Sequence, residues 1–459
     1  MLIAVWIVTF CLIIGVGVYA GTQIKSSSQW SGGDKTLNAL SLGCIFAAWQ
    51  IGGMAIVGAA QNGYNLGISG AWYSIAGSFY FIFLAFFAKV IRVNMPGESV
   101  PAYLQSKYDV RTTRLYSYAW IVYGFLYIPM QLKTVSSIIQ IVLPGLNLSL
   151  AMLIGVTIAV IYTSFSGMRG ASAVGRVVCI GIYVLLIGFV VTSLPSFGGY
   201  DGLLSKLPAN YDSFHNMPTH RIIAWVVGGC ISTAVMQAVL QPLLAAKDPD
   251  AARKGSILGY VLAAPICILT AICGMMSKAS GANLGDGTTA FAYAIKSLSN
   301  PFFAGIVFAF ATMIIAATMA TMMLATGTII TNVYKTEINP HASDAQILKI
   351  SKTITFIFAF LTLIPANVIP SKSLTNLFLT LQHVAAAPVS FSILAGLMWS
   401  KTTKQGAFWS MLCGMIVGVA WMLFGLTDML EAVYPVVIVT YSVGIIVSLA
   451  TYKKEPIKA

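Results

Sequence analysis

The sequence is poor in charge, and it is poorest in acidic residues. Only 8% of its 459 residues are charged, against roughly 25% in an average soluble domain. The 13 Asp and Glu residues fall in segments that we interpret as loops or, for Glu431, at the very start of an apolar segment, so no carboxylate is left at mid-membrane. These shortages exclude a soluble globular domain. They also argue against a membrane enzyme, which would need paired carboxylates or a nucleophile with its base.

Clustered metal ligands are also missing. The seven Cys residues are scattered singly, without a CxxC or Cys/His spacing that would indicate a metal site. A free Cys is commonly a packed apolar residue, and we interpret these seven in that way. The formal net charge of +13 would suggest a nucleic-acid partner in a soluble protein. In a chain that is 58% hydrophobic it indicates membrane topology instead, and we expect no nucleic acid to bind.

Long apolar segments make up most of the chain. A membrane-spanning helix needs about 20 apolar residues, and thirteen segments qualify as candidate spans. Their predicted ranges are 2–22, 38–60, 68–92, 114–143, 147–167, 174–195, 221–246, 254–277, 300–335, 349–369, 374–399, 405–425 and 430–452. We therefore expect an all-α membrane protein in which residues 1–459 form a single transmembrane domain embedded in a lipid bilayer.

The basic residues predict the orientation of these spans. If the N-terminus lies outside, 20 of the 26 Lys and Arg residues fall on the cytoplasmic side and five on the other side. Cytoplasmic loops carry such an excess of Lys and Arg. We expect the N-terminus outside and the C-terminus in the cytoplasm, in a plasma membrane or a bacterial inner membrane.

An odd number of spans suits two inverted groups of five helices. A leading helix and loop (1–37) would precede the first group (38–195) and the second group (221–399), and two trailing helices (405–452) would follow. Each group opens with a helix containing a glycine pair, Gly52–Gly53 and Gly228–Gly229. Paired interruptions of this kind point to a binding site near the bilayer midplane. Close helix packing by small residues is the alternative explanation.

Several motifs between about Ser41 and Phe424 resemble those of the sodium:solute symporter family, and they occur along this chain in the family's order. They are Ala48–Gly67, Trp225, Gln241–Lys247 with Ala251–Gly255, Trp399–Ala407, and Tyr162–Met168 with Ser166 where the family has Gly. The resemblance implies the inverted five-plus-five bundle called LeuT-type. It also implies a secondary active transporter, a symporter that moves a small solute by alternating access with sodium coupling.

The resemblance further implies a sodium site between the first and eighth core helices. Its ligands would be the backbone carbonyls of Ala48, Ile51 and Ile314, with Ala317 and Thr318 at the positions of two hydroxyl ligands. A second alignment puts Ala316–Ala317 at the hydroxyl positions. Oxygen ligands suit a hard cation, but at most one of the two hydroxyls remains.

The sodium site is therefore degenerate, and the family's carboxylate in the fifth core helix is absent near Val174–Gly175. We expect sodium as the coupling ion and no other cofactor. Proton-coupled or ion-independent exchange, with Lys133 replacing the cation, is the alternative.

Two titratable residues fall inside apolar segments. Lys133 lies within the third core helix, where a charge costs roughly 2.5–3.5 kcal/mol on the insertion scale, so it is a functional candidate. It could replace a cation, carry a proton, bind a solute carboxylate, or serve structure alone. His383, in the tenth core helix, can change its charge near neutral pH, although a lone His is commonly a packing residue.

The resemblance places a solute cavity near the broken helices and the third, sixth and tenth core helices. These stretches offer Trp49, Gln50, Met54, Ala55, Tyr127, Gln131, Lys133, Ser232, Thr233, Gln237 and His383. The set is too apolar for a sugar and fits a small solute with an apolar part. Lys133 favours a carboxylate, such as an organic acid or an amino acid. A non-transporting membrane sensor is the rival function, and the oligomeric state is not indicated.

Overall fold

The computed structural model describes residues 1–22, 26, 29–30, 35–95, 99–369 and 374–452, without the side chains of 164–166, 168–169, 374–376 and 428. Five residues used for the predicted orientation (Lys25, Lys372, Lys453, Lys454 and Lys458) and the side chains of Ser166 and Met168 lie outside this description. The described residues form helices and no strand, apart from one isolated bridge between Leu37 and Ala246. The prediction of an all-α membrane protein is confirmed.

Most of the α-helices follow the predicted apolar segments in order, and three short ones, Val100–Lys107, Gly199–Leu204 and Ala290–Leu298, lie in the predicted connections. Their bounds are α1 (Leu2–Gly21), α3 (Ala39–Gln50), α4 (Ala59–Leu66), α5 (Trp72–Gly77), α6 (Tyr80–Asn94), α7 (Val100–Lys107), α8 (Val110–Val142), α9 (Leu148–Ser193), α10 (Gly199–Leu204), α11 (Thr219–Ile231), α12 (Gln237–Leu244), α13 (Pro249–Ala263), α14 (Ile266–Ala279), α15 (Ala290–Leu298), α16 (Pro301–Val333), α17 (Asp344–Leu361), α18 (Leu363–Val368), α19 (Leu374–Ala386), α20 (Gly396–Met398), α21 (Lys404–Leu423) and α22 (Val433–Thr451).

The number of membrane spans stays a prediction. In the described part of the chain, ten helices are long and apolar enough to cross a membrane, or eleven if a bent pair counts as one span. Thirteen were predicted. The difference arises partly because the part of α9 before the kink at Gly167, whose φ is 50°, counts only as a shorter apolar helix, Leu148–Thr163. The first core helix is also divided, and its first half, α3, has only 12 residues.

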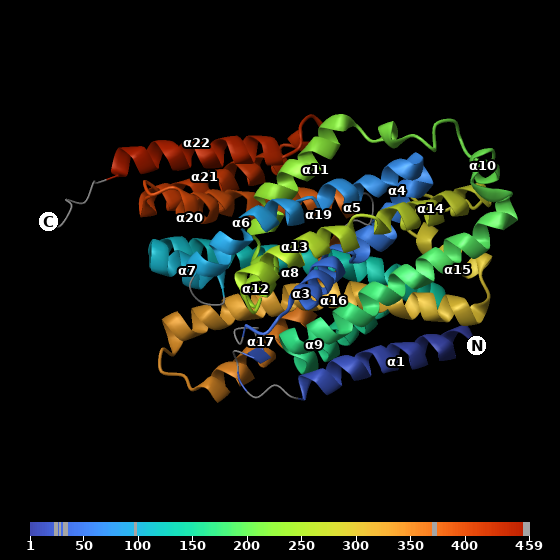
Figure 1. Cartoon of the computed structure of the whole chain (residues 1–459), viewed down its shortest axis with the longest axis horizontal. Helices are drawn as coiled ribbons and strands as arrows, with labels where there is room; N and C mark the ends of the chain where they lie inside the picture. The colour runs from blue at the N-terminus through green and yellow to red at the C-terminus, as the bar shows by residue number, and fades with distance from the viewer. Residues whose placement is uncertain (23–25, 27–28, 31–34, 96–98, 370–373, 453–459) are drawn as a thin grey trace.

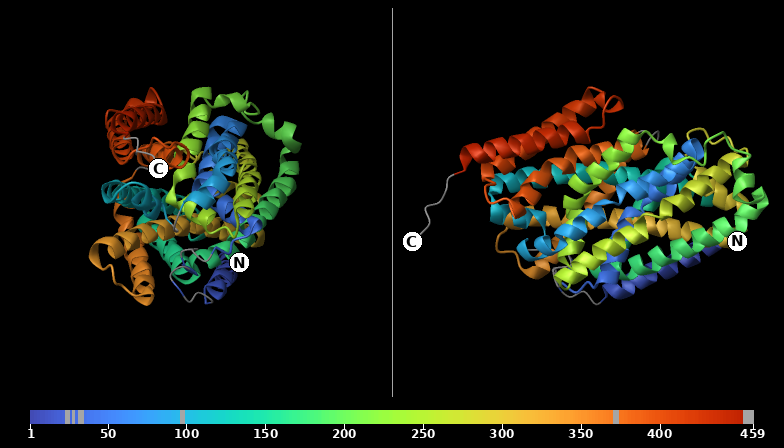
Figure 2. Two further views of the ribbon diagram at one scale, coloured as in Figure 1. Left: turned by 60° about the vertical axis from the view of Figure 1, so that its left-hand side comes forward. Right: turned by 45° about the horizontal axis from the view of Figure 1, so that its top comes forward.

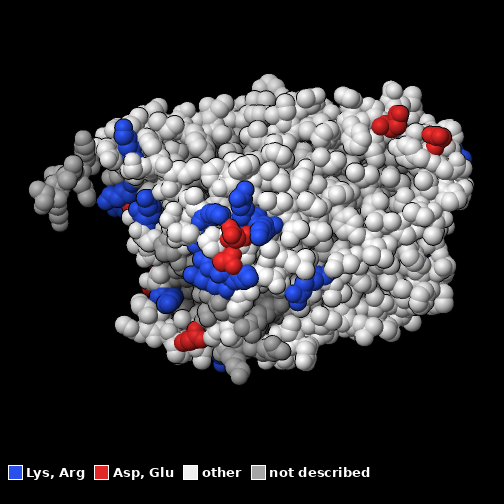
Figure 3. Space-filling model, in the orientation of Figure 1, with Lys and Arg blue, Asp and Glu red and all other residues white. Residues whose placement is uncertain are grey.

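The helices lie along the long axis of the molecule (Figure 1). The leading helix α1 packs against α9 and α16, while α21 and α22 pack together on the opposite side of the bundle (Figures 1 and 2). The N-terminal end of α1 and the C-terminal end of α22 lie at opposite ends of the molecule (Figure 1). On the face that Figure 3 shows, Lys and Arg side chains gather in the half of the molecule that holds the C-terminal end of α22. We call this half the basic end.

The predicted interruption at Gly52–Gly53 is present. Helix α3 ends at Gln50, and the chain resumes as a single π-helical turn, η1 (Met54–Gly58), before α4. Single π-helical turns are rare and frequently lie at functional sites. Both glycines are required by close contacts, because a Cβ at Gly52 would collide with Thr318 and one at Gly53 with Thr134.

The prediction of a second interruption at Gly228–Gly229 is wrong. Helix α11 continues through both glycines to Ile231, and the chain breaks at the 3-10 turn η5 (Thr233–Val235) and the extended residue Met236. Beyond the break, α12 is inclined by 57° to the helical segment Thr219–Val235 that precedes it. The glycine pair serves packing instead, because Gly228 lies directly against the ring of His383 and Gly229 faces Gly77 and Tyr80.

This packing makes the two glycines unequal. We predict that Gly228→Ala lowers the free energy of unfolding by about 1–3 kcal/mol, the usual cost of overpacking a core, because the new methyl group collides with His383. Gly229→Ala is the matched control, since its Cβ meets no atom closer than 3.3 Å. Thermal unfolding of the purified proteins in detergent measures both, and equal transition temperatures for the two variants would contradict this interpretation.

Candidate functional site

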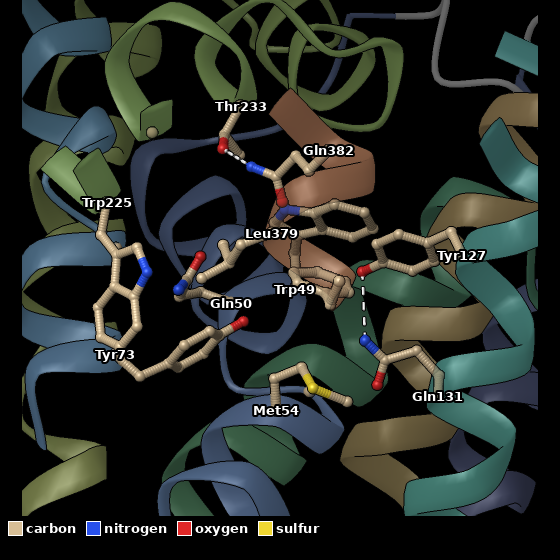
Figure 4. A pocket seen from close by; sticks show the side chains of 14 residues that line it. Trp49, Gln50, Met54, Tyr73, Tyr127, Gln131, Trp225, Thr233, Leu379 and Gln382 are labelled. Atoms are coloured by element: carbon tan, nitrogen blue, oxygen red, sulfur yellow. Dashed lines mark hydrogen bonds between the residues drawn. The ribbon is translucent and has the colours of Figure 1, made fainter. Parts of the chain in front are cut away.

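A small closed cavity lies where the interrupted helices meet α8 and α19 (Figure 4). Its volume is about 20 Å³, which leaves room for about one water molecule, so the structure is closed around it. We call it the central cavity. The residues that line it are Trp49, Gln50, Gly52, Met54, Tyr73, Gly77, Tyr127, Gln131, Trp225, Gly229, Thr233, Phe378, Leu379 and Gln382.

Aromatic rings form much of the wall of the central cavity. The indole of Trp49 stacks on the ring of Tyr127, with centroids 5.5 Å apart and planes inclined by 5° (Figure 4). Phe378 extends this cluster, its centroid 5.0 Å from that of Tyr127. On the other side of the cavity the ring of Tyr73 packs edge to face against that of Trp225, with centroids 6.2 Å apart. These rings offer flat apolar surfaces to whatever occupies the cavity.

Three glutamine amides supply hydrogen-bonding groups between the rings. Gln50 accepts a hydrogen bond from the hydroxyl of Tyr80 at 3.2 Å, and Gln382 donates one to Thr233. Gln131 donates weakly to the hydroxyl of Tyr127, at 3.4 Å. Among the described residues, none of those that line the cavity is charged. The cavity therefore combines flat apolar walls with neutral donors and acceptors.

A side chain from another helix stabilises the break in the first core helix by a hydrogen bond. In an uninterrupted α-helix the N–H of Gly53 would donate to the carbonyl of Trp49, four residues earlier. Here it donates to Oε1 of Gln131 on α8, at 2.9 Å. Gln131 thus satisfies a backbone donor that the break exposes, and the carbonyl of Trp49 is released from its helical partner.

The released carbonyls converge on one hydroxyl group. Oγ1 of Thr318, on α16, lies 3.0 Å from the carbonyl oxygen of Ala48, 3.4 Å from that of Trp49 and 3.1 Å from that of Ile314. Thr318 is buried, with 1% of its surface exposed. We call this group the oxygen cluster. It gathers neutral oxygen atoms at the C-terminal end of α3, where the helix dipole also favours a positive charge.

The oxygen cluster brings together three of the five residues predicted as sodium ligands: Ala48, Ile314 and Thr318. Ile51 is fully buried at the break, directly before Gly52. Ala317, beside Thr318, carries no side-chain oxygen. The contacts of Thr318 favour the alignment that puts it, rather than Ala316–Ala317, at the hydroxyl positions. Gly52 lines the central cavity and also abuts Thr318, so cavity and cluster share a wall.

Six of the eleven residues predicted for the solute cavity line the central cavity. They are Trp49, Gln50, Met54, Tyr127, Gln131 and Thr233. Ala55, Lys133, Ser232, Gln237 and His383 do not line it. The carbonyl of Ala55 accepts a hydrogen bond from Thr270, Ser232 donates to the carbonyl of Gly228, and Gln237 accepts from the N–H of Val100.

Helix geometry explains the positions of Lys133 and His383. Lys133 follows Gln131 by two residues, which turns it about 200° around α8 and away from the cavity. It is buried, with 6% of its surface exposed. His383 follows Gln382 and is fully buried against Gly228. Neither ring nitrogen of His383 has a hydrogen-bond partner among the described residues.

Besides glycines, sequence reasoning missed five residues that line the cavity: Tyr73, Trp225, Phe378, Leu379 and Gln382. Phe378 and Gln382 are four residues apart, so they share one face of α19. That spacing could have favoured Gln382 over His383. Tyr73 had no comparable signal, since its place depends on how the short helix α5 packs against α11.

A bundle of apolar helices with two broken members around a closed cavity defines a membrane transporter of the inverted-repeat class. The match to known proteins identifies the family. The sodium:solute symporter family model matches residues 31–414, and the chain belongs to that family. Its relatives are transporters, not enzymes.

Curated relatives align with most of the chain. It is 24% identical to a sodium/glucose cotransporter of Vibrio parahaemolyticus over 92% of this chain and 84% of the relative. It is 22% identical to sodium/glucose cotransporter 4 of Danio rerio, over 92% of this chain and 71% of the relative. It is also 22% identical to human sodium/myo-inositol cotransporter 2, over 91% of this chain and 69% of the relative.

Two solved structures share the fold. A Na+-coupled sialic acid symporter in a substrate-bound outward-open state superimposes with a TM-score of 0.76 at 13% identity, covering 99% of both chains. A nucleobase-cation-symport-1 family transporter in a closed conformation gives 0.63 at 15% identity, covering 91% of this chain and 92% of the other. These similarities confirm the predicted LeuT-type fold.

The contact between Gln131 and Gly53 generates a stability prediction. Gln131→Leu removes the acceptor of a buried N–H, and an unsatisfied buried donor costs about 1–3 kcal/mol. We expect a lower unfolding temperature in detergent. Gln140→Leu is the matched control, because Gln140 lies on the same helix and its amide bonds only a partly buried carbonyl, that of Leu146. An unfolding temperature that falls as much in the control would contradict a special role for Gln131.

Proposed function

We propose that this protein is a secondary active transporter that moves a small uncharged solute across the membrane by alternating access, with sodium coupling. The observation that carries the proposal is the shared wall between the central cavity and the oxygen cluster. Both are built around Gly52, at the break in the first core helix. A cation that orders this break favours the cavity shape that binds solute, and linkage makes the effect reciprocal.

Sodium is the coupling ion that the oxygen cluster suits best. The cluster offers neutral oxygen atoms and no thiolate or imidazole, which is the ligand set of a hard cation. The carbonyl of Ile51 is proposed as a further ligand. Ala317 gives the site one side-chain hydroxyl fewer than the family pattern, so we expect weak sodium binding. Membership of a family of sodium:solute symporters supports this assignment.

The lining of the cavity favours an uncharged solute. A carboxylate would find no cationic partner there, because the expectation of a carboxylate depended on Lys133, which does not line the cavity. Three glutamine amides suit hydroxyl or amide groups, and the stacked rings suit a flat apolar face. Gln382 and Trp225 make the lining more polar than the sequence indicated. The relatives named for glucose and myo-inositol carry uncharged solutes, which supports this choice.

The distribution of charge supports the predicted orientation. The basic end is proposed to face the cytoplasm, with the N-terminus outside, in a plasma membrane or a bacterial inner membrane. The rival functions are a proton-coupled or ion-independent exchanger in which Lys133 acts in place of the cation, and a non-transporting membrane sensor. They differ from the proposal in what drives solute movement.

Uptake into proteoliposomes tests the proposal. Sodium and pH gradients are imposed separately, and a panel of labelled uncharged solutes (glucose and myo-inositol among them) is compared with amino acids and organic acids. We expect an inward sodium gradient to accelerate uptake of one uncharged solute while a pH gradient does not. Uptake that follows only the pH gradient favours the exchanger. If no solute in the panel is taken up under either gradient, the sensor becomes the better explanation.

We expect the sodium dependence of uptake to require Thr318. We predict that Thr318→Ala removes the side-chain oxygen of the cluster and abolishes the sodium stimulation of uptake. Thr321→Ala is the matched control. Its hydroxyl lies one turn further along α16 and bonds only the carbonyl of Ala317 at 2.9 Å. Loss of stimulation in the control, or its retention in Thr318→Ala, would contradict the assignment.

The missing hydroxyl can also be restored. We predict that Ala317→Ser lowers the sodium concentration needed for half-maximal uptake by about two- to tenfold, the range expected for one added hydrogen-bond-strength contact. The measurement is uptake at graded sodium concentrations. An unchanged or higher sodium requirement would show that position 317 does not face the ion.

A further inference from the structure

A surface cavity lies where two apolar helices begin side by side at the basic end. Helix α8 starts at Val110 and α21 at Lys404, the two helices pack together, and the cavity at their first turns has a volume of about 550 Å³. Thr403, directly before α21, is hydrogen-bonded to Ser448 and Thr451 in the last turn of α22, which places the cavity at the basic end (Figure 1). We call it the interfacial cavity.

Two cationic side chains line the interfacial cavity and lack a partner within the described part of the chain. Arg111 and Lys404 are exposed, and neither side chain forms an ion pair or a hydrogen bond with a described residue. Asp109 supplies the carboxylate of the lining, and its Oδ1 accepts hydrogen bonds from the N–H and the hydroxyl of Thr112, both at 2.8 Å. Asp109 therefore caps its own helix, and the lining keeps a net positive charge.

The positions of the two cations are unfavourable for the helices that carry them. Arg111 is the second residue of α8 and Lys404 the first residue of α21. Beyond the N-cap Asp109, neither helix has an acidic residue in its first turn. The partial positive charge at a helix N-terminus repels a cation and attracts an anion. An anion in the cavity would interact favourably with both side chains and with the N-terminal ends of both helices.

The second turn of α21 gives the interfacial cavity an aromatic wall. Phe408 follows Lys404 by four residues and Trp409 follows Gln405 by four, so each pair shares one face of the helix. Four residues advance the helix by about 6 Å toward the middle of this apolar span. The two rings pack edge to face with centroids 5.5 Å apart, and 47% of the surface of Trp409 is exposed. The cavity thus changes from cationic to apolar in the direction in which a phospholipid changes from headgroup to acyl chain.

We propose that the interfacial cavity binds an anionic phospholipid, with its phosphate between Arg111 and Lys404 and its acyl chains against Phe408 and Trp409. The volume is that of a ligand-sized cavity, and Trp with basic side chains is typical of a membrane interface. Anionic lipids are concentrated in the cytoplasmic leaflet, which the basic end is proposed to face. The aromatic wall favours a lipid over a soluble phosphate, which has no apolar part to cover these rings.

Native mass spectrometry of the full-length protein in detergent measures this binding. The protein is titrated with phosphatidylglycerol and, separately, with phosphatidylcholine of the same acyl chains. We expect phosphatidylglycerol to bind about fivefold more tightly or better. The double variant Arg111→Gln, Lys404→Gln should weaken the binding of phosphatidylglycerol by about tenfold or more, because both cationic partners of the phosphate are lost.

A second double variant is the matched control. Arg253→Gln, Lys254→Gln removes the same two charges from exposed residues of α13 that do not line the interfacial cavity, so it should leave the affinity for phosphatidylglycerol unchanged. Equal weakening in both double variants, or equal wild-type affinity for the two lipids, would show a general attraction of lipid to the protein surface and overturn the site.

Asp109 allows a test in the opposite direction. Asp109→Asn keeps a residue type that caps a helix but removes the negative charge from the lining, so we expect phosphatidylglycerol to bind more tightly. This variant keeps the proposal testable if the double variant at Arg111 and Lys404 does not fold. An affinity that is unchanged or weaker in Asp109→Asn would contradict the assigned site.

Competition separates a lipid headgroup from a soluble anion. We expect inorganic phosphate and glycerol 3-phosphate to leave bound phosphatidylglycerol in place at concentrations similar to that of the lipid. Displacement of the lipid by either ion would assign the cavity to a soluble phosphate compound and overturn the lipid assignment. None of these measurements depends on transport, so this inference and the proposed function can fail separately.

Discussion

The structure depends on how a broken helix satisfies its backbone inside a membrane. In the hydrocarbon core no water is available, so each N–H and C=O released by a break must find a partner within the protein. At Gly52–Gly53 the amide oxygen of Gln131 accepts a hydrogen bond from the N–H of Gly53. The hydroxyl of Thr318 lies within hydrogen-bond distance of the carbonyl oxygens of Ala48 and Trp49. One side chain from α8 and one from α16 therefore hold the break open.

The same two contacts place the candidate sites. Gln131 lines the central cavity on one side of the break, and Thr318 completes the oxygen cluster on the other. Solute and cation would thus contact the same break in the first core helix, and a shared element of this kind is the physical requirement for coupling. Neither site holds a carboxylate among the residues that the structure describes, so the ion would be held by neutral dipoles and the solute by amides and rings. Such a design favours modest affinities that change as the break rearranges.

Much of this architecture could be predicted from the sequence, and the errors have local causes. The composition indicated the helical membrane class, and the first break followed from Gly52–Gly53 in an apolar helix. The second break was misplaced because Gly228 and Gly229 serve packing, while the turn Thr233–Val235 and the extended residue Met236 carry the change of direction. A glycine pair alone does not distinguish these two uses.

The site was harder to predict than the fold. Trp49 and Gln50 were predicted to line the cavity because they lie directly before the glycine pair that indicates the break in the sequence. Lys133 and His383 were chosen for their titratable side chains, but the turn of each helix directs them away from the cavity, while Gln131 and Gln382 face it. The alignment around Thr318 was ambiguous in sequence, and only its distances to Ala48 and Ile314 favour one choice.

Equilibrium binding of radioactive sodium to the purified protein tests the central claim most directly. If the carbonyls released at the break and Thr318 form a cation site, the protein binds sodium saturably, excess potassium does not displace it, and Gln131→Leu weakens it by disordering Gly53. The absence of any saturable sodium binding by folded wild-type protein, or an affinity unaffected by Gln131→Leu, would contradict the account.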